Sequence, residues 1–502
     1  MKVSGLGHFA LGQSVPSKRH AVCVSLPTVE DLIGYEEKNS DTLSAISSGY
    51  PRFVRHSKIH ELSEYWKTLD QAPDSDNFFF PNLSDLHFAK ESCDISNDDI
   101  YGYESYHRLR LPKFSEDSKK LQKFHQHAGF GLSSRHAESI LNSMGLCLDV
   151  EQVSDNPNAE KEIKTVIAQA HGQGITSKDV VLTSSGANAF TSAFRAALEV
   201  TRQKGKCIWI RLGWLYLDTI EIMDWLTLEN ENIISLNHPS EFNQLDDLFS
   251  KYGQNIAGII TEFPSNPLLH CCELEKVSQL CSEHDALLLV DPTMASPKNA
   301  KVTTYCDIVI NSLTKYANWE GDVMMGSIVF PPSSNKGLEI KEITQNHVCP
   351  PFQKDLERLG EQIPFYNSFI ERTNLSQIEI VNFLKSHPKV ENVYYAYQES
   401  TGSHYRQIAG DEKPGCVISF EINGNFKDFY NSLAMLKSPS FGTEFTLLCP
   451  YIYLAHYDKL TSHKGREALK MAGLSPELCR LSVGLEDPEM IKEVLSEALA
   501  KA

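Results

Sequence analysis

The feature that most constrains the fold is an alternation of short apolar runs and longer amphipathic segments between about residues 160 and 310. The apolar runs Asp179–Thr183, Cys207–Ile210 and Ala286–Val290 are typical of buried strands. Segments with helical spacing lie between them, such as Ala187–Thr201 and Leu274–His284. This alternation indicates an α/β fold in which a mostly parallel sheet is covered by helices on both faces. Ligands of such sheets bind at the carboxyl ends of the strands.

The pattern changes after about residue 365. A long amphipathic segment leads into three further apolar runs, at Val390–Tyr395, Cys416–Ile422 and Leu478–Val483, which indicate a smaller α+β domain. Because 502 residues are too many for one small core, we expect several parts. They are an amino-terminal extension at 1–120, a large domain at 121–365 and a carboxy-terminal domain at 366–502.

Composition argues against several classes of protein. Acidic residues outnumber basic ones by 65 to 47, and the formal net charge of −18 argues against a nucleic-acid partner. No apolar run approaches the ~20 residues of a membrane span, so we expect no membrane contact. The amino terminus has no secretory apolar core, and we expect a cytoplasmic protein. The 12 cysteines lie mostly in apolar runs, as reduced, buried thiols do.

One cluster of potential metal ligands stands out. His270, Cys271 and Cys272 are followed by Cys281 and His284. Their spacing matches no common zinc pattern, and the segment has the spacing of an amphipathic helix. We therefore predict no metal site.

Candidate site residues follow the predicted strands. The first group is Thr183–Ala189 (TSSGANA), which joins a strand to a helix. Its small residues let backbone N–H groups and the helix amino terminus approach an anion, most naturally a phosphate. A tight turn without a ligand has the same composition, so this group indicates a phosphate only in combination with others.

Three more features come at strand ends. Asp291 ends the run ALLLV, where a carboxylate can keep a ring nitrogen protonated or simply cap a helix. Lys315 ends a later strand and turn that also contain Ser312 and Thr314, and Tyr216 offers a ring face for stacking. A phosphate cradle, an aspartate, an aromatic ring and a lysine together describe a pocket for pyridoxal 5′-phosphate (PLP). In such a pocket the lysine binds the cofactor and the aspartate helps the ring to accept electrons.

These residues belong to longer motifs. In chain order they are SSGANA (184–189), YLDT (216–219), EFPSNP (262–267), VDPTMASP (290–297), DIVINSLTKY (307–316), GDVMMG (321–326), SFGTEF (440–445) and RLSVGLED (480–487). The set resembles the PLP enzymes of Cys/Met metabolism, the group of cystathionine γ-synthases and γ-lyases. The earlier segments VSLPTVEDLIGYEE (24–37), GYPRFVRH (49–56) and GLSSRHAE (131–138) resemble the longer, fungal-type cystathionine γ-synthases. The resemblance implies the aspartate-aminotransferase type of fold, which is fold type I of PLP enzymes.

The resemblance also implies roles toward the cofactor. Lys315 is expected to form the Schiff base and to move protons. Asp291 is expected to pair with the pyridine nitrogen, Tyr216 to stack on the ring and assist the proton relay, and Asn266 to bond the ring hydroxyl. The expected phosphate ligands are Gly186, Ala187, Ser312 and Thr314.

The α-carboxylate of the substrate is expected to bind Arg480, with help from Ser440 and Asn266. A guanidinium suits this task because its planar fork forms two parallel hydrogen bonds with a carboxylate. The expected partners are therefore small amino acids. Because members of the family share pockets between subunits, the resemblance also implies a homodimer or homotetramer.

The activity that the resemblance implies first is γ-replacement, a step of transsulfuration and methionine biosynthesis. An O-acyl-L-homoserine and L-cysteine would give L-cystathionine. A γ-lyase acting on cystathionine, methionine or another γ-substituted amino acid is an alternative, because it needs the same lysine and fold. Homocysteine formation from sulfide is a third variant, and a PLP-binding protein without turnover is the rival from another class.

The chain also departs from the family's pattern. Members usually carry a Tyr-x-Arg pair before Asn-Pro-Thr, donated to the phosphate of the neighbouring subunit. The matching region here, HQHAGFGLSS (125–134), has neither, so His127, Arg135 or the amides of the glycine loop are candidates to replace the pair. Leu217 and Asp218 stand where two glycines are usual, and YANWEGD (316–322) stands where a Gly-His is common. These departures concern the substrate more than the cofactor.

Overall fold

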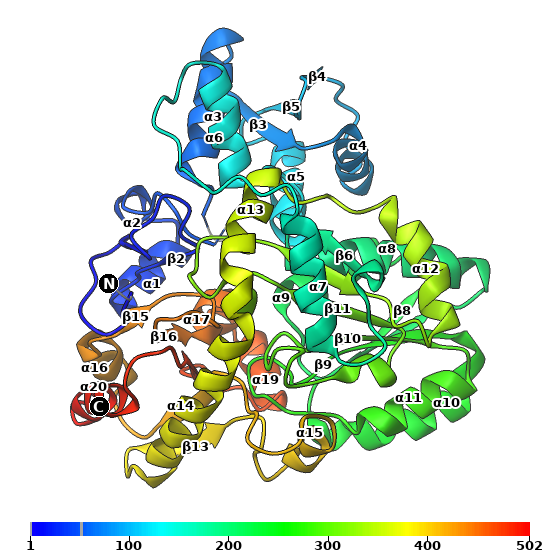
Figure 1. The fold of residues 1–502 in the computed structure, drawn as a ribbon, viewed down its shortest axis with the longest axis vertical. Helices are drawn as coiled ribbons and strands as arrows, with labels where there is room; N and C mark the ends of the chain where they lie inside the picture. The colour runs from blue at the N-terminus through cyan, green and yellow to red at the C-terminus, as the bar shows by residue number, and fades with distance from the viewer. Residues whose placement is uncertain (1–2, 51–53) are drawn as a thin grey trace.

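A computed structural model describes residues 3–50 and 54–502 (Figure 1). Its centre is a seven-stranded sheet with the order β6-β12-β11-β10-β9-β7-β8. Strands β11, β10, β9, β7 and β8 are parallel, whereas β12 runs antiparallel to both of its neighbours. The predicted α/β class is confirmed, with one antiparallel strand that the sequence pattern did not indicate. The strands are β6 (Val180–Thr183), β7 (Ile208–Leu212), β8 (Asn232–Leu236), β9 (Ile256–Glu262), β10 (Leu287–Asp291), β11 (Ile308–Ser312) and β12 (Gly326–Val329).

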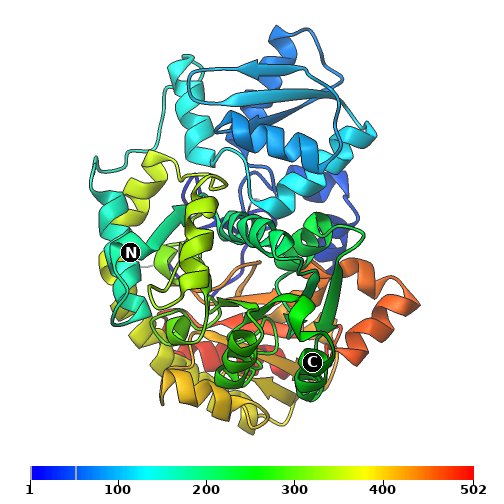
Figure 2. The ribbon, with the colours of Figure 1, turned by 90° about the vertical axis from the view of Figure 1, so that its right-hand side faces the viewer.

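Helices cover both faces of this sheet because its central strands are apolar on both sides (Figures 1 and 2). In β10, Leu287 and Leu289 pack into one core, whereas Leu288 and Val290 pack into the other. This division follows from the two-residue period of a strand. Each such side chain, when fully buried, contributes about 1.5–3 kcal/mol. The helices of this part are α7 (Ala159–His171), α8 (Gly186–Gln203), α9 (Leu217–Leu226), α10 (Leu245–Tyr252), α11 (Leu274–Glu283), α12 (Asn335–Gln345) and α13 (Gln353–Gln362).

The carboxy-terminal part forms a second sheet with the order β13-β14-β17-β16-β15. The three predicted strands are present as β13, β14 and β17, whereas β15 and β16 were not predicted. Asp487 caps the last helix by accepting a hydrogen bond from the N–H of Glu489 (3.0 Å). The strands are β13 (Val390–Tyr394), β14 (Val417–Ile422), β15 (Leu436–Lys437), β16 (Leu447–Pro450) and β17 (Cys479–Ser482). The helices are α14 (Tyr366–Ser386), α15 (Gly402–Ala409), α16 (Phe426–Ser432), α17 (Tyr451–Ala455), α18 (Tyr457–Leu460), α19 (His463–Met471) and α20 (Pro488–Leu499).

Residues 3–50 lie against this second sheet (Figure 1). Leu6 forms a β-bridge with Met435, and the N–H of Gly5 donates a hydrogen bond to the carboxylate of Glu486 (2.6 Å). Val24 is buried in the same core as β14 and β17. The first fifty residues are therefore attached to the carboxy-terminal domain at several points. Their elements are β1 (Ser14–Val15), β2 (Cys23–Val24), α1 (Val29–Glu36) and α2 (Ser40–Ser44).

The next part, from α3 to α6, is a small unit at one end of the molecule (Figures 1 and 2). Its three-stranded antiparallel sheet contains an aromatic cluster, and Phe78, Phe79 and Phe80 are buried. The short strand β4 forms because Ile100–Gly102 pairs with β5. The elements are α3 (Ser57–Leu69), β3 (Ser75–Phe80), α4 (Leu83–Ser92), β4 (Ile100–Gly102), β5 (His107–Pro112), α5 (Glu116–Ala128) and α6 (Ser134–Ser143).

The expected boundary at residue 120 falls inside α5, and the one at 365 falls directly before α14. Helix α5 also contacts the large domain, because Phe124 packs on Trp225 of α9 with 5.4 Å between the ring centroids. We propose the same division into three parts, with α5 joining the first two. Among the helices of the described residues, none is both long enough and apolar enough to cross a membrane.

Candidate active site

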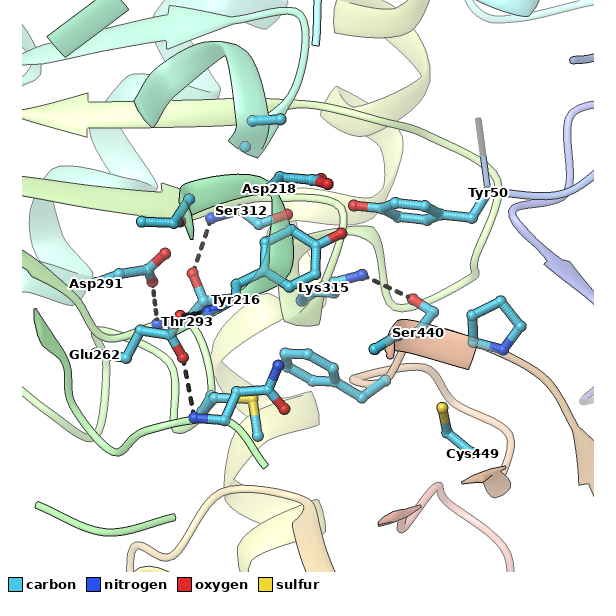
Figure 3. A pocket seen from close by; sticks show the side chains of 18 of the residues that line it. Tyr50, Tyr216, Asp218, Glu262, Asp291, Thr293, Ser312, Lys315, Ser440 and Cys449 are labelled. Atoms are coloured by element: carbon cyan, nitrogen blue, oxygen red, sulfur yellow. Dashed lines mark hydrogen bonds between the residues drawn. The ribbon is translucent and has the colours of Figure 1, made fainter. Parts of the chain in front are cut away.

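The candidate site is a pocket at the carboxyl ends of β9, β10 and β11, the edge at which we expected it (Figure 3). It contains about 870 Å³ of empty space, part of it open to solvent. Of the predicted site residues, all except Thr314 line it: Gly186, Ala187, Tyr216, Asn266, Asp291, Ser312, Lys315, Ser440 and Arg480. The hydroxyl of Thr314 instead accepts a hydrogen bond from the N–H of Met325 (3.1 Å). Thr314 therefore stabilises the turn behind the pocket.

Two carboxylates lie side by side on the floor of the pocket. Asp291 and Glu262 are direct neighbours in the register of β10 and β9. Asp291 accepts a hydrogen bond from the N–H of Thr293 (2.8 Å), and Glu262 accepts from the N–H groups of Asn266 (3.0 Å) and Tyr216. Burial raises the pKa of Asp291, and burial together with the charge of Asp291 raises the pKa of Glu262. Glu262 was not predicted, although it opens the motif EFPSNP that contains Asn266.

Lys315 lies at the centre of the pocket, in the turn that follows β11 (Figure 3). Its Nζ donates a hydrogen bond to the hydroxyl of Ser440 (3.0 Å). The same atom lies 4.4 Å from the ring centroid of Tyr50 and 5.1 Å from that of Phe441. Ser440 has a φ of 95°, outside the conformations that a residue with a side chain adopts without strain. The loop thus holds Ser440 in a strained conformation that brings its hydroxyl to the lysine.

The amino terminus of α8 lines the pocket, where we expected an anion cradle. The hydroxyl of Ser185 caps this 18-residue helix by accepting from the N–H of Asn188 (3.0 Å). Gly186 is required because a Cβ there would lie 2.7 Å from the Cβ of Ser312. The hydroxyl of Ser312 is buried and has no hydrogen-bond partner among the described residues. A free donor beside a helix amino terminus is a site for an anion.

Arg480 lies opposite, on β17, and is 6% exposed. It donates one hydrogen bond to the side-chain oxygen of Asn266 (2.8 Å) and another to the carbonyl oxygen of Ser440 (3.1 Å). Its Nε is buried without a partner among the described residues. The guanidinium also lies 5.2 Å from the ring centroid of Phe441 and 5.1 Å from that of Tyr451. Arg480 is thus oriented by four polar and aromatic neighbours and still has a donor for a carboxylate.

Tyr50 is a pocket residue that we did not predict. Its hydroxyl, that of Tyr216 and the carboxylate of Asp218 point toward one another (Figure 3). The sequence contained a signal, because Tyr50 and Arg52 have the Tyr-x-Arg spacing that we sought at 125–134. The chain therefore does contain such a spacing, although Arg52 lies outside the described residues. Tyr50 approaches Lys315 of its own chain.

The segment 125–134 lies next to the cradle but has other roles. His127 Nδ1 lies 2.9 Å from the carboxylate of Asp218. Arg135 forms ion pairs with Glu151 (2.5 Å) and Asp355 (3.2 Å), so its charge is already neutralised. The carbonyl oxygen of Gly129 accepts hydrogen bonds from the hydroxyls of Ser184 and Ser185. Arg135 is therefore a structural residue, and Gly129 presents an acceptor rather than an amide to the cradle.

The cysteine cluster near residue 271 is part of the core. Burial raises the pKa of the Cys272 thiol to about 12, which keeps it in the protonated form that binds metals poorly. Within residues 3–50 and 54–502, no group of three or more His, Cys, Asp or Glu side chains is arranged to hold a metal ion.

The pocket has the geometry of a PLP-dependent enzyme, and comparison with known proteins specifies the class further. A family model described as Cys/Met metabolism PLP-dependent enzyme matches residues 154–500. The chain belongs to this family.

Full-length relatives support the same assignment. L-2-amino-4-chloropent-4-enoate dechlorinase/desaturase of Streptantibioticus cattleyicolor is 30% identical, over 96% of this chain and 97% of that protein. Cystathionine γ-synthase of Neurospora crassa is 24% identical, over 98% of both chains. The solved structure of cystathionine γ-synthase from Xanthomonas oryzae pv. oryzae has a TM-score of 0.57 and 22% identity, covering 69% of this chain and 86% of that one. This likeness confirms the predicted fold.

The cofactor of the family is PLP, as predicted, and the pocket fits it. The unpartnered hydroxyl of Ser312 and the helix terminus at Gly186 suit its phosphate. The carboxylate pair of Asp291 and Glu262 suits a protonated ring nitrogen, which would offset the repulsion between the two groups. Lys315 lines the same pocket.

Proposed function

We propose that the protein is a γ-replacement enzyme, which joins an O-acyl-L-homoserine and L-cysteine to form L-cystathionine. The observation that carries this proposal is the room for two reactants. The pocket shares Tyr50, Ala187 and Asp218 with a second cavity, which contains about 1200 Å³ of empty space, part of it open to solvent. A second reactant can approach Lys315 through this shared wall.

In this proposal Asp291 would hold the ring nitrogen, Asn266 the ring hydroxyl and Tyr216 the ring. Gly186, Ala187 and Ser312 would hold the phosphate, and Thr314 supports them through Met325. When bound, PLP accepts the electron pair released as the Cα–H bond of the substrate breaks.

The chain's own residues position the substrate and move its protons. Arg480 holds the α-carboxylate through its fork, which fixes Cα above Lys315. The Lys315 amine, released from Ser440, takes the proton from Cα and then one from Cβ. Tyr216 assists the proton transfer at the departing γ-group. The rings of Tyr50 and Phe441, which lie against Nζ of Lys315, exclude water.

A second candidate is γ-elimination from a γ-substituted amino acid, such as one that carries a γ-halogen. The observation in its favour is the relative from S. cattleyicolor, a dechlorinase/desaturase by name, which aligns with this chain over almost its whole length. Elimination needs the same Lys315 and Arg480 but no second amino acid.

The test is mass spectrometry of the products of the purified, PLP-loaded protein. The substrates are O-acetyl- and O-succinyl-L-homoserine, each with and without L-cysteine, and L-2-amino-4-chloropent-4-enoate. Cystathionine that forms only with cysteine supports γ-replacement. Dominant 2-oxobutyrate and ammonia, or release of chloride, would instead support elimination. Lys315→Ala should abolish every product, and retained turnover in this variant would refute the assignment of the lysine.

We also propose that the protein acts in the cytoplasm as a homodimer or homotetramer. The support for an oligomer is the resemblance to a family whose members share pockets between subunits. Sedimentation equilibrium of the PLP-loaded protein measures the mass directly, and a mass of 56.4 kDa would mean that the protein is a monomer.

A further inference from the structure

The second cavity lies between the α3–α6 unit and the large domain. Its wall includes Arg55, Phe78 and His125 on one side, and Ser185 and Ala187 of the anion cradle on the other. The cavity is therefore joined to the active-site pocket but has a polar wall of its own. Neither Arg55 nor His125 of this wall has a predicted role.

Arg55 is the unusual residue of the cavity. Protein surrounds it closely enough that burial lowers the pKa of its guanidinium, yet its side chain remains accessible to water. Both are true because Arg55 faces the space inside the cavity. Its guanidinium lies 5.6 Å from the ring centroid of Phe78. No acidic side chain of the described residues comes within the 4.0 Å of an ion pair with it.

The other strongly charged side chains of the described wall are paired. Arg135 binds Asp355 (3.2 Å), and Asp322 binds Arg358 (2.9 Å). Asp218 lies 2.9 Å from His127. Arg55 is thus the strongly charged side chain of the described wall that has no ion pair within 4.0 Å, although Asp76 is near enough to act on its charge. An arginine cannot lose its proton under ordinary conditions, so a partly desolvated one is stabilised by an anion.

A second polar atom of the wall also lacks a partner. His125 Nε2 is buried and has no hydrogen bond among the described residues. The ring of His125 stands edge-on to Phe80, with 5.4 Å between the ring centroids. Arg55 and His125 thus provide a cation and a polar ring on a wall of mixed polar, apolar and aromatic residues, a composition that suits a small organic anion.

We propose that Arg55 binds the α-carboxylate of the second, thiol-bearing amino acid in this cavity. The inference rests on the proposed γ-replacement and specifies where its second reactant binds. With the carboxylate held at Arg55, the thiol extends past Tyr50 and Asp218 toward Lys315. The sulfur forms a bond to the γ-carbon, whose bond to the acyl oxygen breaks, and the proton of the thiol leaves with the acyl acid.

The first experiment compares two thiols in the PLP-loaded enzyme. L-Cysteine carries a carboxylate, whereas 2-mercaptoethanol does not. Arg55→Gln should raise KM for L-cysteine by about 10- to 100-fold, the effect of losing a charge-assisted hydrogen bond. KM for 2-mercaptoethanol and for the acyl-homoserine should stay within about twofold. An equal rise in KM for L-cysteine and for 2-mercaptoethanol would overturn the proposal.

The matched control is Arg195→Gln. Arg195 resembles Arg55 because its guanidinium also packs on a phenylalanine ring, 3.3 Å from the ring centroid of Phe88. Burial lowers the pKa of Arg195 to about 10. It does not line the second cavity. This control should leave KM for L-cysteine unchanged, and a rise equal to that of Arg55→Gln would overturn the proposal.

A binding measurement separates this inference from the proposed function. Calorimetry of the PLP-loaded protein with 3-mercaptopropionate, a thiol carboxylate without an amine, does not require turnover. Suppose that 3-mercaptopropionate binds the unchanged protein but not Arg55→Gln, and that the unchanged protein makes no cystathionine. The binding site would then be supported, and γ-replacement would be refuted. Binding unchanged in Arg55→Gln would overturn the site. Inorganic phosphate is titrated in parallel, and loss of PLP from Arg55→Gln would mean that Arg55 serves the cofactor phosphate instead.

Discussion

Replacement of Gly186 by alanine gives the sharpest test of the anion cradle. The new Cβ would lie 2.7 Å from the Cβ and 2.9 Å from the Oγ of Ser312. Carbon atoms in contact prefer about 3.5–4.0 Å, so the cradle must widen by roughly 1 Å. Such overpacking costs about 1–3 kcal/mol, of which alanine recovers up to about 1 kcal/mol because it favours a helix. We therefore expect a net loss of about 0–2 kcal/mol in the free energy of unfolding.

The effect on the cofactor should be larger than the effect on the fold. Widening moves the α8 amino terminus and Ser312 apart, so the dissociation constant of PLP should rise by about 10- to 100-fold. Equilibrium dialysis measures the PLP affinity, and thermal unfolding of the cofactor-free protein measures the stability. Gly360→Ala is the control, because its Cβ would also be crowded, 3.2 Å from the Cβ of Ala159, but far from the pocket lining. PLP affinity in Gly186→Ala equal to that of the unchanged protein would refute the phosphate site.

Three further predictions concern single groups of the pocket. Arg480→Lys should raise KM for the amino-acid substrate by about 10- to 100-fold without changing PLP affinity, because an ammonium lacks the fork that a carboxylate needs; a weaker PLP affinity in the variant would contradict this role. Ser312→Ala should weaken PLP binding by about 2- to 10-fold, whereas Thr314→Ala should lower the melting temperature and leave the affinity unchanged; dialysis and thermal unfolding decide between them, and the reverse pattern would show that the hydroxyl of Thr314 reaches the phosphate. Burial raises the pKa of Asp291 from 3.8 to about 6 in the cofactor-free fold, so its contribution favours the folded state at low pH and is lost as the pH rises from about 4 to about 6. The difference in urea stability between the unchanged cofactor-free protein and Asp291→Asn should therefore fall by about 2–3 kcal/mol over that range, and a constant difference would exclude the shift.

Local patterns were sufficient to predict much of the large domain. The run ALLLV is a buried strand because its side chains meet apolar helices on both faces, and Asp291 follows it at the sheet edge. Strand β12 was missed because Gly326–Val329 is short and one of its two partners, β6, is distant in sequence. Periodicity gives no information about such pairings.

Three features of the site could not be predicted from the local sequence, for similar reasons. Thr314 lies beyond the end of β11, where a turn redirects its hydroxyl to Met325. Glu262 acquires its role from its neighbour across the sheet, Asp291, rather than from its own motif. Tyr50 reaches the pocket because residues 3–50 pack on the carboxy-terminal domain and on the large domain, where the N–H of Val22 bonds the carbonyl oxygen of Gly321 (2.9 Å). The contacts of Glu262 and Tyr50 are long-range, whereas Thr314 and Met325 are 11 residues apart.

The attachment of the first residues to the last domain has a consequence for synthesis. Gly5 bonds to Glu486, so this contact cannot form until almost the whole protein has left the ribosome. At about 5–20 residues per second, this wait lasts roughly 25–100 s. During that time the seven-stranded sheet can form, but the pocket still lacks the late residues Ser440 and Arg480. A nascent chain can thus be folded at its centre well before its pocket is complete.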